Sequence, residues 1–320
     1  MCNSQIKFGR LMKDQQLTWR HFHPKLWLTW FGFGCWRLAV ILPYPLMVYL
    51  GHKLGLLMYL IGGYRYKVAE KNLKLCFPDI SQQEQKNLLR ANFISYGIAF
   101  FEVGIAWWWP TSRLKKIIHV EGVEHIDNLN GRGALLMAIH HTTIEVGASG
   151  LMIERQIDGM YRPHKNIVYD YIQKKGRLKR SADADVYTRD DVRGILKALQ
   201  NGKIIWYAPD QDYGPKQSVF ASFFGIQAAT VTATAKFAKV GKSAVLPFSH
   251  IRLPDNQGYK ITVHRPLEGF PENDEVSDAE RINRVIEEMI LQQPDQYLWA
   301  HRRFKTRPKG EKRPYSKKRG

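Results

Sequence analysis

The sequence predicts an α/β protein, a sandwich in which helices flank a mostly parallel sheet. Short apolar runs typical of buried strands occur near residues 133–139, 203–208 and 243–249. Helix-like stretches separate and follow them, near residues 143–155, 166–177, 190–200 and 229–240. This alternation is typical of a parallel sheet covered by helices. Such sheets bind ligands beyond the carboxyl ends of their strands, which is where we expect the site.

The first element along the chain is an apolar segment over residues 26–42. It contains one charge, Arg37, and many aromatic side chains. A spanning helix needs about 20 apolar residues, so this segment is marginal, and Pro43 and Pro45 break or kink a helix that continues. We favour a single N-terminal membrane-anchoring helix, with an interfacial hairpin as the alternative. A cleaved signal peptide is not expected, because Arg37 interrupts the apolar part and no small-residue cleavage site follows.

The second element is a long helix that begins after Ser81. Ser81 and Glu84 have the spacing of a capping box, in which the two side chains satisfy N–H groups of the first turn. Apolar side chains then recur at helical spacing as far as Trp107, and Pro110 follows the end of the pattern. We expect these side chains to form part of the core.

The strand near 133–139 ends in His140, and Glu145 follows after four intervening residues. Residues five apart on a continuous helix lie about 140° from each other, so the two can meet only if the chain turns between them. A strand that ends at His140 and a helix that begins near Thr142 or Thr143 would let Glu145 reach back. A histidine held by a carboxylate is suited to act as a general base.

The spacing favours His140 over its neighbour His141, because Val146 and not an acid stands five residues beyond His141. A short motif of this kind also has a structural interpretation. His140 could be a core histidine at a strand end, and Glu145 could serve the helix N-terminus electrostatically.

Composition and charge limit the classes of partner. The 320 residues carry a formal net charge of +19, and a strongly positive protein attracts nucleic acid, anionic lipid or an acidic protein. Ten lysines and arginines lie in residues 302–320, so we expect a basic tail that is solvated and disordered after Pro314. The sequence has no RNP, zinc-finger or basic-zipper pattern, which argues against nucleic acid. Nine tryptophans favour a membrane interface.

The three cysteines predict neither disulfides nor a structural zinc site, because Cys2, Cys35 and Cys76 show no C-x2-C spacing and no even-numbered framework. A reducing, cytosol-facing location fits, and Cys76 is expected to pack as a small apolar residue. We expect no cofactor and no metal.

The histidine block on a strand-to-helix turn resembles the first motif of the glycerolipid-type acyltransferases. Further segments extend the resemblance, from about residue 24 to about residue 308, to the late (secondary) acyltransferases of lipid A biosynthesis. The lauroyl-type branch is the more similar one, because the myristoyl branch more often carries aspartate at the position of Glu145. The segments are Leu42-Pro-Tyr-Pro45, Asn72-Leu-Lys-Leu-Cys-Phe-Pro78, Ala106-Trp-Trp-Trp-Pro110, Tyr161-Arg-Pro163 and His301-Arg-Arg-Phe-Lys-Thr-Arg-Pro308.

The resemblance implies a glycerolipid-acyltransferase-like fold and an O-acyltransferase. Such an enzyme moves a fatty acyl chain, lauroyl or similar, from acyl carrier protein to the 3-hydroxyl of an acyl group of Kdo2-lipid IV(A). It works at the cytoplasmic face of the cell inner membrane, in contact with phospholipid, as a single-pass or monotopic protein. Direct transfer is expected, because the sequence has no G-x-S-x-G nucleophile elbow.

The resemblance also implies roles for individual residues. His140 would be the base and Glu145 its orienting partner. Arg177 matches the second block of the family, and its guanidinium suits bidentate binding of a phosphate or carboxylate on the acceptor. Arg180 could do the same work. Asp210 matches the third block and is expected to bind a sugar hydroxyl or to orient Arg177.

We therefore expect four regions: a basic segment over residues 1–25, an apolar membrane segment over 26–62, the catalytic domain over 63–308 and a tail over 309–320. Two alternative functions stay open on the residues alone. One is an acyltransferase for a glycerophosphate, for which the same histidine block would serve. The other is a basic membrane-binding protein without catalytic activity.

Overall fold

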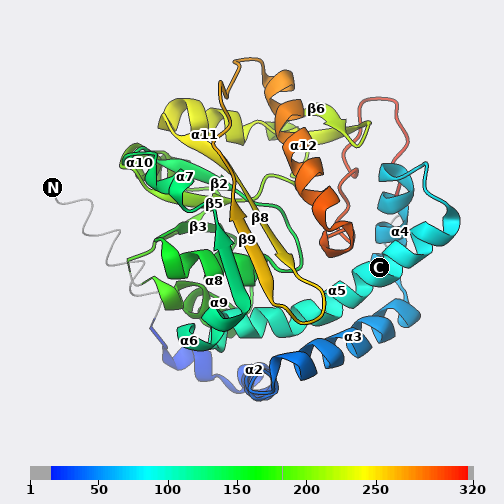
Figure 1. The fold of residues 1–320 in the computed structure, drawn as a ribbon, viewed down its shortest axis with the longest axis vertical. Helices are drawn as coiled ribbons and strands as arrows, with labels where there is room; N and C mark the ends of the chain where they lie inside the picture. Colours follow the sequence, from blue (N-terminus) through cyan, green and yellow to red (C-terminus); the bar gives the residue numbers. More distant parts are fainter. Residues whose placement is uncertain (1–15, 182, 316–320) are drawn as a thin grey trace.

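The structure is a computed structural model that describes residues 16–181 and 183–315. Most of the predicted basic N-terminal segment, with Cys2, and the last five residues of the predicted tail lie outside the described residues. Figure 1 shows a twisted sheet with helices on both faces, and a long pair of helices, α3 and α5, that runs along one side of the molecule. The predicted α/β class is confirmed.

The sheet has seven strands in the order β1-β9-β8-β2-β5-β3-β4, and neighbouring strands run parallel except for β8 and β9. A separate antiparallel hairpin is formed by β6 and β7. The strands are β1 (Ile118–Glu121), β2 (Ala134–Met137), β3 (Asp158–Tyr161), β4 (Val186–Thr188), β5 (Ile204–Tyr207), β6 (Ser218–Phe223), β7 (Ile226–Val231), β8 (Ala244–Arg252) and β9 (Tyr259–Val263).

The helices fall into an N-terminal group that leads to the long helix α5 and a later group that covers the sheet. The first group is α2 (Trp27–Ala39), α3 (Tyr44–Ile61), α4 (Tyr64–Cys76), α5 (Gln82–Trp108) and α6 (Thr111–Leu114). The second is α7 (Glu124–Asp127), α8 (Ile144–Glu154), α9 (Ile167–Arg177), α10 (Val192–Gln200), α11 (Ala233–Gly241) and α12 (Glu275–Gln292).

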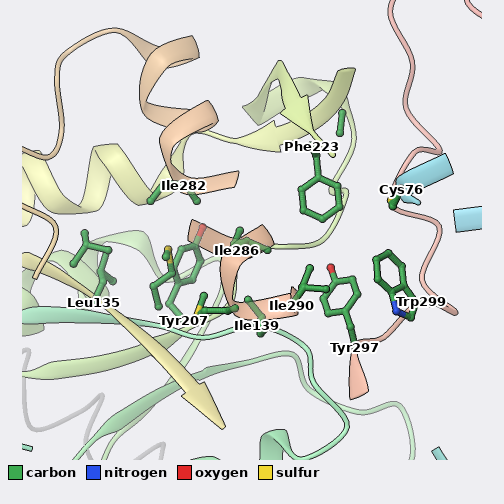
Figure 2. Packing of buried hydrophobic residues seen from close by; sticks show 14 of the residues in the cluster. Cys76, Leu135, Ile139, Tyr207, Phe223, Ile282, Ile286, Ile290, Tyr297 and Trp299 are labelled. Carbon is green, nitrogen blue, oxygen red and sulfur yellow. The ribbon is translucent and has the colours of Figure 1, made fainter. Parts of the chain in front are cut away.

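Both faces of the central strands are buried, which explains why their sequences are continuous apolar runs. Leu135 of β2 packs in a cluster with α10, α11 and α12 on one face. Its neighbour Leu136 packs with Leu151 of α8 on the other face. Figure 2 shows the first cluster, which extends from Leu135 to Trp299 near the C-terminus.

Several predicted elements are confirmed. The three predicted strands are β2, β5 and β8, and Ser81 caps α5 by accepting a hydrogen bond from the Glu84 N–H while Glu84 accepts one from the Ser81 N–H. Cys76 is buried in the core, as expected. The helix predicted near 229–240 is wrong in its first residues, because 229–231 belong to β7 and the helix begins at Ala233. The sequence analysis did not predict β6 and β7. Their hairpin packs against α12.

The predicted apolar segment is divided at Pro43 into two helices. Helix α2 has only 13 residues and is about 20 Å long, too short to cross a hydrocarbon core of about 30 Å. Among the described residues, the helices long and apolar enough to cross a membrane do not include the one over residues 26–42. By length and composition α3 and α5 could each cross a membrane, but more than half of the apolar window of α5 is buried inside the protein.

Helices α3 and α5 approach each other closely because glycines line their contact. A Cβ atom added to Gly97 of α5 would lie 2.2 Å from the carbonyl oxygen of Gly51 and 2.2 Å from the backbone nitrogen of Gly55, both on α3. At such distances the backbones themselves would have to move apart.

We predict that Gly97→Ala destabilises the protein. The overpacked contact should cost about 1–3 kcal/mol, more than the roughly 0.5–1 kcal/mol that alanine gains over glycine inside a helix. The matched control is Gly34→Ala in α2, where an added Cβ meets no atom within 4 Å. Urea unfolding in detergent should show a loss for the first variant and a small gain for the second. Equal stability of the two variants would contradict the close contact.

Candidate active site

The parallel pairing of β2 with β5 brings His140 and Asp210 together. The register places Met137 opposite Tyr207, and the Ala138 N–H donates to the Tyr207 carbonyl at 2.8 Å, so the pairing continues past the strand ends. Three residues beyond that register pair lie His140 and Asp210. Two chains that leave neighbouring parallel strands in register therefore deliver these two side chains to the same sheet edge.

Asp210 holds His140 through two hydrogen bonds. The backbone N–H of His140 donates to Oδ2 at 2.9 Å, and the ring Nδ1 lies 2.5 Å from Oδ1. Asp210 is fully buried. Burial by itself would raise the pKa of this carboxyl, but His140 and its two hydrogen bonds outweigh burial and lower the pKa to about 2. The carboxylate is thus ionised and only accepts, so the neutral ring carries its proton on Nδ1.

The remaining ring nitrogen of His140, Nε2, is free to act. It makes no hydrogen bond within residues 16–181 and 183–315, nor is it among their buried unpaired atoms. The side chain of His140 is 25% exposed. An accessible, unprotonated Nε2 with a carboxylate behind Nδ1 can remove a proton from a bound hydroxyl and stabilise the imidazolium that results.

The structure differs from the expectation that Glu145 contacts His140. Among the described residues, the side-chain partners of Glu145 are Arg177 and Trp107. The Arg177 Nε lies 3.0 Å from Oε1, Nη2 also donates to Oε1, and the Trp107 indole N–H donates to Oε2 at 2.8 Å. Glu145 does stand in the first turn of α8, as predicted, but its side chain turns toward α5 and α9.

The Glu145–Arg177 ion pair is a mostly buried pair. Burial acts to raise the pKa of Glu145, but the Arg177 guanidinium and the hydrogen bonds outweigh it and hold that pKa below its ordinary value. Gly176 allows α9 to pack closely against Trp107, since a Cβ there would lie 2.5 Å from Cγ of Trp107. The side chain of Arg177 is 31% exposed, and Nη1 makes no hydrogen bond within the described part of the chain.

Arg180 contacts the end of helix α5. Its guanidinium donates to the carbonyls of Ala106 and Trp109, and the neighbouring Lys179 ammonium donates to the carbonyls of Trp108 and Trp109. The last carbonyls of a helix lack partners within it and attract cations. Burial lowers the pKa of Arg180 to about 10. Arg180 was expected to bind substrate through its guanidinium, but Nη1 and Nη2 already bind these carbonyls.

His141 is buried, whereas the ring of His140 is partly exposed. The Nδ1 of His141 donates to the carbonyl of His250 at 3.1 Å, and only 2% of the residue is exposed. Burial lowers the pKa of His141 to about 4. His250 lies beside it and bonds to Thr143, at 2.9 Å from Nδ1 to the hydroxyl. This arrangement agrees with a structural part for His141.

The C-terminal segment supports both loops through backbone and side-chain hydrogen bonds. The Leu298 N–H donates to the His140 carbonyl at 3.0 Å, and the Thr142 N–H donates to the Gln296 carbonyl at 2.7 Å. Asp212 accepts hydrogen bonds from the backbone N–H and the hydroxyl of Thr306, at 2.8 and 2.9 Å. Thr306 belongs to the His301–Pro308 motif, which was the available signal in the sequence.

The site contains no arrangement for a metal among the described residues, where no group of three or more His, Cys, Asp or Glu side chains is placed to bind one ion. What the described side chains offer is a base, a buried carboxylate behind it and an ion pair between Arg177 and Glu145. This set is suited to acyl or proton transfer to a hydroxyl group.

Comparison with known proteins gives matches along nearly the whole chain. A model of the family "Bacterial lipid A biosynthesis acyltransferase" matches residues 15–306. The Escherichia coli (strain K12) lipid A biosynthesis lauroyltransferase is 42% identical over 90% of this chain and 94% of the relative. The palmitoleoyltransferase of the same strain is 39% identical over 97% and 99%. Its myristoyltransferase is 26% identical over 92% of each.

We predict that Glu145→Gln destabilises the fold by about 2–3 kcal/mol, below the range for a fully buried pair because Arg177 is 31% exposed. Because the folded pKa of Glu145 is depressed, the stabilisation is present above the unfolded value of about 4.3 and is lost as the pH falls below it. Urea unfolding at pH 6 and at pH 3.5 should therefore show a difference from wild type that shrinks in acid.

The control for this prediction is Glu154→Gln. Glu154 pairs with Lys115 on the surface at 3.9 Å, with both side chains more than 40% exposed, and such pairs contribute at most about 1 kcal/mol. A Glu145→Gln variant as stable as this control would show that the pair with Arg177 does not support the fold.

Proposed function

The chain belongs to the bacterial lipid A biosynthesis acyltransferase family, and on this premise we propose that it transfers a fatty acyl chain from acyl carrier protein to the 3-hydroxyl of an acyl group of Kdo2-lipid IV(A). Membership confirms the resemblance seen in the sequence and makes the protein an acyltransferase of lipid A biosynthesis. It also decides against a glycerophosphate enzyme and against a protein without catalytic activity, the two alternatives raised by the sequence.

The observation that carries the proposal is the accessible Nε2 of His140 with Asp210 behind it. The acceptor hydroxyl donates its proton to Nε2 as its oxygen attacks the thioester carbonyl carbon. An oxygen–carbon bond forms, and the carbonyl oxygen takes the negative charge. The carbon–sulfur bond then breaks, and the leaving thiolate takes the proton from His140. Asp210 fixes the ring and stabilises the imidazolium in between.

Glu145 has a positioning role in this proposal. The sequence suggested that it orients His140 directly, whereas its contacts support an action through Arg177. Glu145 binds one edge of the guanidinium, through Nε and Nη2, and Nη1 is left to bind a phosphate or carboxylate of the acceptor. A fixed arginine of this kind would align the acceptor hydroxyl with His140.

The acyl chain is proposed to be lauroyl or similar. The higher identities are to relatives named as a lauroyltransferase and a palmitoleoyltransferase, at 42% and 39%, and a myristoyltransferase follows at 26%. Chain-length selection depends on the depth of an apolar site, and each methylene contributes only about 1–3 kcal/mol.

We propose that the protein lies on the cell inner membrane through the outer faces of α2 and α3, with the catalytic domain toward the cytoplasm. Exposed side chains on these helices include Leu28 (81%), Phe31 (70%) and Leu60 (78%). Large apolar side chains gathered on neighbouring helices are typical of an interfacial segment.

The decisive experiment offers the purified enzyme acyl carrier proteins loaded with chains of 10 to 18 carbons, with Kdo2-lipid IV(A) as acceptor, and identifies the lipid product by mass spectrometry. We expect a single acyl addition, preferentially of a chain of about 12 carbons, and slower transfer from acyl-coenzyme A. Equal use of the coenzyme A thioesters would remove acyl carrier protein from the proposal.

In the same assay, His140→Ala and Asp210→Asn should each lower kcat by at least about 10²-fold, as expected for loss of a general base or its orienting partner. Glu145→Gln should mainly raise the KM for the lipid acceptor. His141→Ala should be milder. A Glu145→Gln variant with a lower kcat than Asp210→Asn would restore the direct histidine–glutamate dyad expected from the sequence.

Membrane attachment is tested with Leu28→Glu combined with Phe31→Glu. Charges on this face should reduce flotation with vesicles of anionic phospholipid, while turnover in detergent stays near that of wild type. The control is Val240→Glu, because Val240 is 53% exposed on α11, away from the two helices. If the double variant floats as well as the control, attachment does not use this face.

A further inference from the structure

His301 is a second histidine beside the His140–Asp210 pair. The Asp212 N–H, two residues beyond Asp210, donates to the His301 ring at 3.2 Å. The His301 N–H donates to the Leu298 carbonyl at 3.0 Å, and the Leu298 N–H donates to the His140 carbonyl at 3.0 Å. His301 is thus bonded to both loops that carry the residues of proton transfer in the proposed function. The sequence motifs predicted no individual role for His301.

The tautomer of His301 follows from its backbone partner. The N–H of Asp212 donates to Nε2 of His301 at 3.2 Å. A backbone N–H can only donate, so Nε2 carries no proton, and the neutral ring has its proton on Nδ1. Burial disfavours the charged ring and lowers the pKa of His301 to about 4. The ring therefore stays neutral at physiological pH.

The partner of His301 is itself fixed. The carboxylate of Asp212 accepts hydrogen bonds from Thr306 and from the Gly214 N–H, the latter at 2.8 Å. The backbone carbonyl of Asp212 accepts one from the Lys305 ammonium at 2.7 Å. Asp212 is only 2% exposed. The ring of His301 is held in one orientation by a rigid loop, as a preorganised donor requires.

The proton on Nδ1 has no acceptor in the protein. Within residues 16–181 and 183–315, Nδ1 of His301 makes no hydrogen bond, and it is not one of the buried unpaired atoms, so it reaches solvent. Nε2 of His140 has the same status. An oriented donor and an oriented base are both accessible beside the same buried carboxylate.

We propose that His301 is a further catalytic residue, whose Nδ1–H donates a hydrogen bond to the carbonyl oxygen of the acyl thioester as that oxygen becomes negative. This inference rests on the proposed function. The bonds that form and break are those already described: the acceptor oxygen joins the carbonyl carbon, and the thiolate leaves with the proton of the hydroxyl. His301 gains and loses no proton in the step.

The two cationic side chains near His301, Arg303 and Lys305, bind other groups of the protein. Lys305 binds the Asp212 carbonyl, and the Arg303 guanidinium donates to the Ala229 carbonyl at 2.7 Å and to the Thr230 hydroxyl at 3.0 Å. A neutral donor has a further advantage at this place. A charged His301 would attract Asp210 and weaken its hold on His140, whereas the neutral ring leaves the carboxylate to His140.

Two amide variants separate the catalytic role from a structural one. In His301→Asn the side-chain amide nitrogen stands near the position of Nδ1, so a donor remains while the acceptor for the Asp212 N–H is lost. In His301→Gln the longer side chain places its oxygen near the position of Nε2, so the acceptor remains and the donor is lost. We expect His301→Gln to lower kcat by about 10²-fold with little change in KM, and His301→Asn to stay within about tenfold of wild type.

Each variant is assayed with acyl-carrier-protein thioester, with and without Kdo2-lipid IV(A), and its Tm is measured. A His301→Gln variant with wild-type kcat would overturn the proposal. So would equal losses in both variants with a lowered Tm, which would make His301 structural. His264→Gln is the matched control, a half-buried histidine that bonds Ser249 instead of the site loops.

One further variant tests a competing donor in the same loop. Tyr213 lies in the same loop as Asp212 and is 49% exposed. If Tyr213→Phe loses kcat and His301→Gln does not, the donor is the tyrosine. Thioester cleavage without acylation of the lipid would refute the proposed acceptor, and the His301 series would still decide the donor on the cleavage rate.

Discussion

The register between β2 and β5 is the constraint on which the site depends. Both strands are covered on their two faces, so neither can slip without exposing its apolar side chains. The ladder continues to the Ala138–Tyr207 hydrogen bond, and the side chains of His140 and Asp210 meet just beyond it. One residue more or less at either strand end would separate base from carboxylate. The geometry of the His140–Asp210 pair is therefore fixed by the packing of the sheet.

The extended C-terminal segment stabilises this geometry from outside the sheet. Two buried asparagines hold the segment along its length. Asn92 of α5 donates to the carbonyls of Asp295 and Tyr297, and Asn72 of α4 donates to those of Trp299 and His301, each at 2.7 Å. This segment, whose regular structure is limited to a 3-10 turn over Pro294–Gln296 and one bridge from Tyr297 to His141, thus gains fixed hydrogen bonds where water is excluded. Tyr315 bonds Asn72 at 2.5 Å, so the start of the predicted disordered tail packs on the domain.

Helix α5 joins the proposed membrane side of the molecule to the site. Its glycine contact holds α3, and its last turn supplies Trp107 to Glu145 and its carbonyls to Arg180. In its middle, Glu102 forms a buried ion pair with Arg252 of β8 at 2.6 Å. Removing one partner of such a buried pair strongly destabilises a protein, so this pair fixes the helix to the sheet. The position of Arg177 is therefore coupled to the helices that would rest on the lipid surface.

The sequence by itself determined the parallel α/β class, the capped start of α5 at Ser81 and a histidine at the end of β2, because apolar periodicity and capping are local properties. The family motifs indicated the reaction. Only the tertiary structure decided which acid holds His140. Glu145 is near in sequence, but Asp210 arrives through strand pairing over 70 positions, and no local pattern encodes that pairing. The same reason hid β6 and β7 and the loop contacts of His301. Each depends on which residues pack against it, and no local sequence pattern encodes that packing.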